Sequence, residues 1–233
     1  MFIGTIDARA GVLVQDNFND NSIDQTKWTP NPNSGTVVEA NGRIEITNRG
    51  YLDTAAQYDP LVQGPLRITG EWTFQNADWP GHDIMAVLTR SDAVPTGTYR
   101  ETQNGIEFQL NGDGGLRILS RVNGVETYLA PILDFEVNSG ERFFFDARDD
   151  GLNLSFFVQQ IGGAGRSASL TATSPLDFGS DLIVFHNREN SSTAYLDNVT
   201  IEQVPEPSTF VLASLGSLGI LGYAVKRRNR RVR

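Results

Sequence analysis

Hydrophobic and polar residues alternate along short runs of the chain between residues 11 and 203. The clearest run is 66–74, where every second residue is apolar or glycine, and this period of two predicts a half-buried β-strand. Turn signals such as Asn41-Gly42 and Asn123-Gly124 separate the runs. We expect further strands over 12–14, 37–47 (two strands), 84–90, 106–110, 116–120, 125–129, 141–148, 152–159, 182–186 and 194–202. About a dozen short strands at this spacing indicate an all-β antiparallel sandwich or barrel over residues 11–203.

The pattern changes in the last thirty residues. The segment 204–209 contains Pro205-Glu206-Pro207, whose prolines disfavour a helix. Residues 210–225 are uncharged and mostly apolar, and 226–233 hold six basic residues. As a helix, the apolar segment would be about 24 Å long, and the basic residues can extend it by snorkelling toward the about 30 Å core of a bilayer. We therefore expect a linker at 204–209, one membrane-spanning helix at 210–225 and a basic cytoplasmic tail at 226–233, with residues 1–203 exported.

In this order and at the end of the chain, these three blocks resemble the PEP-CTERM sorting signal that exosortase-type enzymes recognise in exopolysaccharide-producing Gram-negative bacteria. The resemblance implies that Pro205, Glu206 and Pro207 are the sorting motif. It also implies export machinery and an exosortase-type processing enzyme as partners. The protein would pass through an inner-membrane intermediate to the cell surface or extracellular matrix. An ordinary C-terminal anchor with a basic stop is the alternative.

The body of the chain has a strongly acidic composition that the tail conceals. Residues 11–203 hold 12 Lys and Arg against 26 Asp and Glu, a net charge of −14, whereas the whole chain carries −9. A domain this acidic repels phosphate backbones, so we expect no nucleic-acid partner. The chain has no cysteine, which excludes disulfides, thiolate catalysis and cysteine-ligated metals.

The first ten residues lack the basic start and the apolar segment of a complete signal peptide. Ala8-Arg9-Ala10 is nevertheless an A-x-A sequence directly before the first predicted strand. We interpret residues 1–10 as the remaining end of a signal peptide whose start lies further upstream. A chance occurrence of A-x-A is the alternative.

A second resemblance concerns residues 12–203. The stretch 16–28, DNFNDNSIDQTKW, looks like the opening of concanavalin A-like (laminin-G-like) jelly-roll domains. The stretch 38–46, VEANGRIEI, is similar to the hairpin that follows it in those domains, and 195–201, YLDNVTI, looks like their closing strand. The resemblance implies a jelly-roll β-sandwich of two curved antiparallel sheets, with the first and last strands close together. Trp28 and Trp72 fall in core-like patterns.

Glycoside hydrolases of the laminarinase and lichenase type share this fold, and they carry an E-x-D-x-E type carboxylate set on one strand of the concave face. The strand 105–111 has a matching spacing, but the three positions are Glu107, Gln109 and Asn111. Retaining hydrolysis needs two carboxyl groups about 5–5.5 Å apart, and two of the three groups here are amides. We expect these side chains to face outward or into the groove, with Glu107 a solvated strand residue unless it takes part in binding.

The two histidines do not suggest catalysis or metal binding either. They are His82, in a predicted loop, and His186, at the end of a predicted strand. Neither is accompanied by a nucleophile-elbow sequence or a zinc-binding spacing. We interpret both as ordinary surface or strand-end residues and predict that the chain is not an enzyme.

Sugar binding fits the composition better than catalysis does. Proteins recognise sugars with aromatic faces against CH groups and with polar groups against hydroxyls. Trp79 and Tyr99 lie in predicted loops, and Arg90 closes a strand from which it could join Glu107 and Gln109 on one sheet face. The alternative is that the aromatics cover core edges and that Arg90 forms a surface ion pair.

No cofactor is required, but the resemblance leaves room for a structural calcium ion. Some laminarinase-like sandwiches bind one near the chain ends through backbone carbonyls and one Asp of the closing strand. Asp197 matches that Asp, and Gly42 lies in the matching hairpin. Six to eight oxygens would be needed in total. The alternative is that Asp197 caps the hydrogen bonds of the closing strand.

We therefore predict an exported, sorted β-sandwich protein that binds polysaccharide without catalysis. One alternative is a diverged glycan hydrolase or lyase, and another is a structural or adhesive surface protein with no small ligand. The sequence does not distinguish polysaccharide binding from a purely structural or adhesive role.

Overall fold

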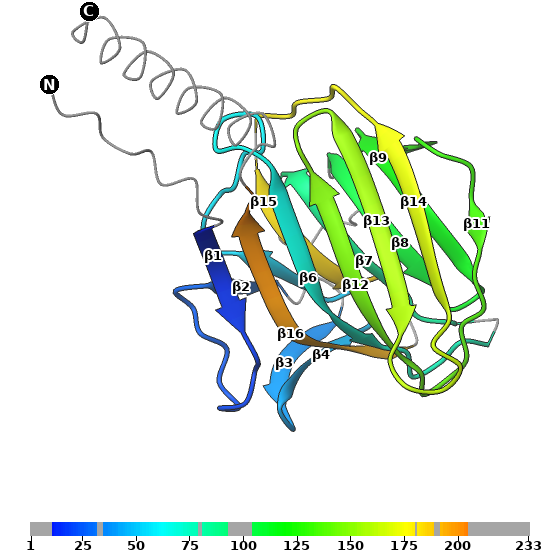
Figure 1. Cartoon of the computed structure of the whole chain (residues 1–233). Helices are drawn as coiled ribbons and strands as arrows, with labels where there is room; N and C mark the ends of the chain where they lie inside the picture. Colours follow the sequence, from blue (N-terminus) through cyan, green and yellow to red (C-terminus); the bar gives the residue numbers. More distant parts are fainter. Residues whose placement is uncertain are drawn as a thin grey trace, which may run out of the picture.

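The structure of the chain, a computed structural model, describes residues 11–31, 35–78, 81–92, 104–179, 181–188 and 192–204. Within these residues, the chain forms two eight-stranded sheets, and every strand pair is antiparallel (Figure 1). The all-β sandwich that the sequence predicts is confirmed. No helix of the described part is long and apolar enough to cross a membrane. The segment 205–233, with the sorting motif and the expected membrane span, lies outside the described residues.

The first sheet, called sheet A, contains the strands at both ends of the domain. Its order is β14-β13-β12-β6-β16-β4-β3, and β1 pairs with the central strand β16. The bounds are β1 Gly11–Asp16, β3 Thr36–Ala40, β4 Arg43–Thr47, β6 Leu66–Thr73, β12 Arg142–Asp149, β13 Asn153–Gln160, β14 Ser167–Thr173 and β16 Thr193–Gln203. Because β1 and β16 are neighbours, the domain begins and ends at the same place, as the jelly-roll resemblance implies.

The second sheet, sheet B, has the order β10-β9-β8-β7-β15-β5-β2, and β11 pairs with β9. The bounds are β2 Trp28–Asn31, β5 Tyr51–Thr54, β7 Ile84–Ser91, β8 Gly105–Asn111, β9 Gly115–Val122, β10 Val125–Tyr128, β11 Leu133–Asp134 and β15 Leu182–Asn187. The strands β9 and β10 are joined through Asn123-Gly124, the turn that the sequence predicts. Both of these residues have positive φ, as this type of hairpin turn requires.

Aromatic side chains fill the space between the two sheets. The ring centroids of Trp72 and Phe145 are 4.2 Å apart in a stacked arrangement, and Trp28 contacts Phe185 edge-on. Trp28 and Trp72 are fully buried, so their assignment to the core is confirmed. Burial of large apolar and aromatic surfaces supplies most of the favourable free energy of folding.

Two edge strands, β14 and β2, were not predicted from the sequence pattern. The edge strand β14 has the sequence SASLTAT, and its residues are exposed or half-buried in alternation. The edge strand β2 contains Pro30, which is tolerated there because an edge strand has one side without ladder hydrogen bonds. Small residues and proline carry a weak strand signal, so these two strands are set by the neighbours with which they pair.

Candidate functional site

The outer face of sheet B, the face turned away from sheet A, is the part of the domain with the most buried polar side chains. The strand β8 shows this clearly, because all seven of its residues are buried, on the outer face as well as on the face toward the core. Phe108 and its neighbours at alternate positions belong to the core, so Glu107, Gln109 and Asn111 point to the outer face. We expected these three to face outward or into a groove, with Glu107 a solvated residue. The predicted face is therefore correct. The prediction that Glu107 is solvated is wrong, because Glu107 and Gln109 are both 0% exposed.

Cross-strand pairing shows which side chains share this face. Glu107 pairs with Leu88 on one side and with Leu119 on the other. Leu119 in turn pairs with Tyr128 of the edge strand β10, and the neighbouring pair is Arg121 with Glu126. Directly paired residues of antiparallel strands point to the same face. The outer face therefore gathers charged, amide and aromatic groups from β8, β9 and β10.

An ion-pair network runs across this face. The Arg121 guanidinium lies 3.3 Å from Glu107 Oε2 and also donates to Glu126. His186 Nε2 lies 3.6 Å from the other oxygen of Glu107. Burial acts to lower the pKa of Arg121, but the charges of Glu107 and Glu126 and their hydrogen bonds outweigh it and raise this pKa. Arg121 is thus held as a cation between two carboxylates.

Arg188 extends the network over the face. It follows β15 in the chain and forms an ion pair with Glu126, although β7, β8 and β9 lie between β15 and β10 in the sheet. Glu126 and Arg188 are partly exposed, with about a quarter of each side chain open to solvent. The network therefore begins at the solvent-exposed β10 edge and continues inward to the buried Glu107 and His186.

Tyr128 is the aromatic residue at that edge. It is 47% exposed and stands beside Leu119 on the outer face. Sequence reasoning did not single out Tyr128, Arg121 or Glu126. The sequence does contain a signal for the Arg121–Glu126 pair. The two-residue turn Asn123-Gly124 fixes the register of the hairpin, and this register places Arg121 opposite Glu126.

Polar atoms without a partner lie on the same face. Gln109 Oε1, Arg121 Nε and Asp53 Oδ1 are buried and have no hydrogen-bond partner among the described residues. Burial raises the pKa of Asp53 to about 7. Asp53 pairs with Val184, next to a small apolar cluster of Tyr51, Ala86, Leu88 and Val184. Buried polar atoms are normally satisfied by protein, water or a ligand, so this face has unused hydrogen-bonding capacity.

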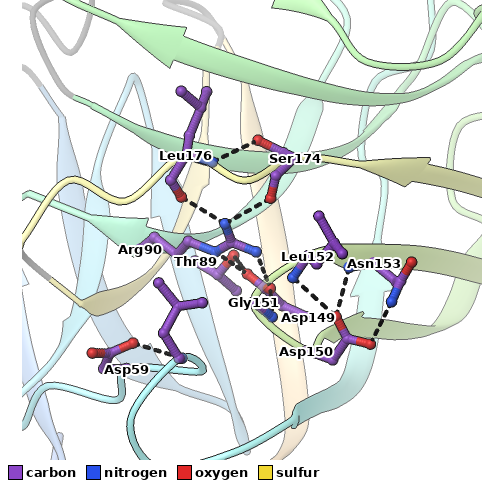
Figure 2. Close-up of polar contacts among 11 residues, drawn as sticks. Asp59, Thr89, Arg90, Asp149, Asp150, Gly151, Leu152, Asn153, Ser174 and Leu176 are labelled. Carbon is purple, nitrogen blue, oxygen red and sulfur yellow. Dashed lines mark hydrogen bonds and ion pairs between the residues drawn. The ribbon is translucent and has the colours of Figure 1, made fainter.

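Arg90 does not belong to this site, which corrects our prediction that it could join Glu107 and Gln109. Its side chain is 1% exposed and forms an ion pair with Asp149 of sheet A. It also donates to the carbonyl oxygens of Ser174 and Leu176, at 3.0 and 2.6 Å (Figure 2). The alternative, a surface ion pair, is also wrong because both charged groups are buried.

A backbone irregularity explains the position of Arg90. Arg90 has φ +51°, and the pairing of β15 with β7 shifts register at this point, between Leu182 and Val184. A β-bulge redirects the side chains that follow from strict alternation. As a result, Thr89 and Arg90 both bond to Asp149, and this group links the two sheets instead of serving the outer face.

Trp79 and Tyr99 lie outside the described residues, so their roles stay predictions.

Both histidines are buried, so the prediction of a surface position is wrong. The prediction that His186 ends a strand is correct, because it is the second-last residue of β15. His186 belongs to β15, is fully buried and lies near the Tyr51 ring, with 5.6 Å between ring centroids. His82 is 2% exposed, and its Nε2 lies 3.7 Å from Asp113 Oδ2. His186 is thus part of the network on the outer face of sheet B, whereas His82 stands near Asp113.

The predicted calcium site involves Gly42 and Asp197. Both lie near the pairing of β4 with β16, where Ile44 faces Leu196. The Asp197 carboxylate accepts a hydrogen bond from the Asn198 amide at 2.7 Å, and burial raises the pKa of Asp197. No group of three or more His, Asp or Glu residues in the described part of the chain could hold a metal ion. The predicted site combines backbone carbonyls with a single Asp, so calcium binding at Gly42 and Asp197 stays a prediction.

Comparison with known proteins assigns the tail and the fold. Residues 203–231 match the PEP-CTERM protein-sorting motif. This match confirms the resemblance drawn from Pro205-Glu206-Pro207 and the blocks that follow, and the motif indicates an exported protein that is sorted by an exosortase. No curated protein sequence matches the chain.

Three solved structures with the same architecture are a lectin, a carbohydrate-binding module and a domain bound to a glycan, according to their titles. A lectin from Bauhinia forficata in complex with GalNAc has a TM-score of 0.59 and 14% identity, with 81% of this chain and 97% of that chain covered. The VIP36 exoplasmic/lumenal domain in a Ca2+/Man3GlcNAc-bound form gives 0.58 and 12%, with 76% and 83% covered. The carbohydrate-binding module CBM66 from Bacillus subtilis gives 0.50 and 13%, with 82% and 97% covered. These likenesses confirm a lectin-like jelly-roll fold.

Proposed function

We propose that this protein is delivered to the surface or extracellular matrix of a Gram-negative bacterium and binds polysaccharide there without catalysis, through the outer face of sheet B. Delivery would pass through an inner-membrane intermediate, from which an exosortase-type enzyme releases the acidic domain near Pro205-Glu206-Pro207. The sorting motif and the lectin-like fold support this proposal.

The observation that carries the binding proposal is the position of Tyr128. It exposes an aromatic side chain at the β10 edge, on the same outer face as the ion-paired groups of Arg121, Glu126 and Arg188. An aromatic face can pack on the CH groups of a sugar ring, while carboxylate and guanidinium groups bond its hydroxyls in pairs. Gln109 is 0% exposed, so its unused acceptor oxygen lies beneath this surface and not at the solvent-exposed β10 edge.

The environment of Glu107 argues against hydrolysis as the function of this face. Its two oxygens face Arg121 and His186, and Gln109 and Asn111 stand where an E-x-D-x-E type set would have carboxylates. Without a second carboxyl group at these positions, that acid and nucleophile pair cannot form here. The face is better suited to hold sugar hydroxyls than to cleave a glycosidic bond.

A glycan array with the detergent-solubilised protein tests the proposal. We expect retention of one class of bacterial polysaccharide and no release of reducing ends. Tyr128→Ala should weaken binding at least about tenfold, a loss of about 1.4 kcal/mol. The matched control is Phe157→Ala on the outer face of sheet A, where the half-buried aromatic ring stands on β13, and it should leave binding unchanged.

Three results would contradict the proposal. Equal weakening by both variants would show that Tyr128 acts only through folding. Absence of binding to every glycan at high concentration would instead favour a structural surface protein. Reducing ends that appear with the wild-type protein but not with Glu107→Gln would favour the hydrolase alternative.

A further inference from the structure

Large apolar side chains are exposed around one end of the sandwich. Val62 is 81% exposed, and Leu61 and Leu152 are each half exposed. Leu61 packs on the turn that contains Leu152, since a Cβ on Gly151 would lie 2.5 Å from Leu61 Cδ2. Figure 2 shows this turn and the loop of Asp59, whose carboxylate accepts from the Leu61 amide. Exposed apolar groups gathered in this way often mark a contact surface.

The chain leaves the domain at the same end. The Val204 amide donates to the carbonyl of Pro65 at 2.7 Å. Val204 lines a cavity of about 690 Å³ together with Pro65, Leu66, Asp150 and Asn153. The exit of the chain and the exposed turn between β12 and β13 therefore border one cavity.

The length of the following segment limits the distance from this end to the membrane. Residues 205–209 precede the apolar run 210–225, and five extended residues span at most about 18 Å. Val12, which pairs with Glu202 one residue from the end of β16, is also exposed. If 210–225 crosses the membrane as the sequence predicts, the bilayer surface lies within reach of all these side chains.

We propose that Val12, Leu61, Val62 and Leu152, here called the exit patch, rest on the lipid bilayer in the membrane-tethered precursor. Apolar side chains at the level of the headgroups gain free energy by leaving water. The charges around the patch have both signs. Asp59 and Asp150 are close to Leu61 and Leu152 in the sequence, whereas Arg148 lines the cavity and, like Arg67, pairs with Asp146. Because both arginines are already held by a carboxylate, we expect no net attraction to anionic lipids. The contact is therefore apolar, persists in high salt and forms on zwitterionic phosphatidylcholine.

Single-cysteine labelling tests this contact, because the chain contains no cysteine. The full chain is reconstituted in phosphatidylcholine vesicles with an environment-sensitive fluorophore at Val62→Cys. A matched sample carries it at Val38→Cys on β3, which lies level with Tyr195, at the opposite end of β16 from the chain exit. Both positions are exposed. We expect nitroxide lipids to quench the label at position 62 several times more strongly than the label at position 38. Equal quenching, or failure of the full chain to float with vesicles, would overturn the proposal.

A second variant separates lipid contact from mere proximity. Val62→Glu should reduce the lipid quenching of a label at Leu152→Cys while the chain still floats with vesicles and keeps its glycan binding. Unchanged quenching at position 152 would overturn the proposal. A photoactivatable probe at position 62 that crosslinks to protein rather than lipid in cells would assign the exit patch to a protein partner instead. Glycan binding is measured separately, so failure of either proposal is recognised independently.

Discussion

The outer faces of the two sheets carry similar charged residues in very different surroundings. On sheet A, the strand β6 alternates buried and half-buried positions, and its outward Glu71 pairs with Arg142, whose side chain is 50% exposed. On sheet B, the outward Glu107 pairs with Arg121, and both are at most 1% exposed. The same strand alternation therefore produces a solvated ion-pair surface on one side of the molecule and a buried polar network on the other.

This difference in burial changes what each ion pair contributes to stability. An exposed ion pair contributes little, because water and salt compete for both charges. A buried pair is costly to assemble and more costly to break, because a lone charge remains without solvation. A buried network on one face is therefore weak evidence for stability but a reasonable place to look for binding.

The largest effect should follow from removing Arg121. Arg121→Ala leaves Glu107 buried beside His186 without its cationic partner, and we expect the free energy of unfolding to fall by about 3–5 kcal/mol. Urea denaturation measures this loss. The double variant Arg121→Ala/Glu107→Gln should recover much of it, because the buried charge is gone. A loss under about 1 kcal/mol in the single variant would show that the network is solvated.

The second effect concerns Asp53, whose pKa burial raises to about 7 from an ordinary value of 3.8. Folding then favours the protonated acid, so this group stabilises the fold at low pH. The contribution declines as the pH rises from about 4 to 7, and at most about 4 kcal/mol is lost. Asp53→Asn should remove this decline when melting temperature is followed against pH. Parallel curves for the two proteins would contradict the prediction.

The smallest effect should come from sheet A. Arg142→Ala removes the partner of Glu71, but Arg142 is half exposed, so we expect at most about 1 kcal/mol of lost stability. The same urea titration measures it, and high salt should reduce the difference further. A loss as large as that of Arg121→Ala would erase the distinction between the two faces.

The sequence predicted the strands that alternate or are bounded by glycine turns. Leu66 to Thr73 and the hairpin at Asn41-Gly42 appear as expected, because their pattern reports directly on one buried face and one turn geometry. The strands β14 and β2 did not stand out, because small residues and proline carry little signal of their own. Pairing with neighbours distant in the chain forms these strands, and a single sequence does not display those neighbours.

The candidate site was only partly predictable. The alternation of β8 correctly placed Glu107 and Gln109 on one face, but nothing local indicates that this face is covered. Arg90 was misplaced because the bulge at φ +51° reverses the expected direction of its side chain. Burial and bulges depend on segments that meet only in the folded domain, so local patterns do not reveal them.

The position of β16 has a consequence for the order of events during secretion. It is the last strand of the domain, yet it lies within sheet A, where it pairs with β6, β4 and β1. Leu66 and Gln203, which are 137 positions apart in the chain, are direct partners, and contacts this distant form late and slowly. Sheet A cannot be completed until residues 193–203 have been delivered, and the sorting motif follows almost at once. The strand that completes sheet A and the sorting motif therefore become available together, at the same end of the chain.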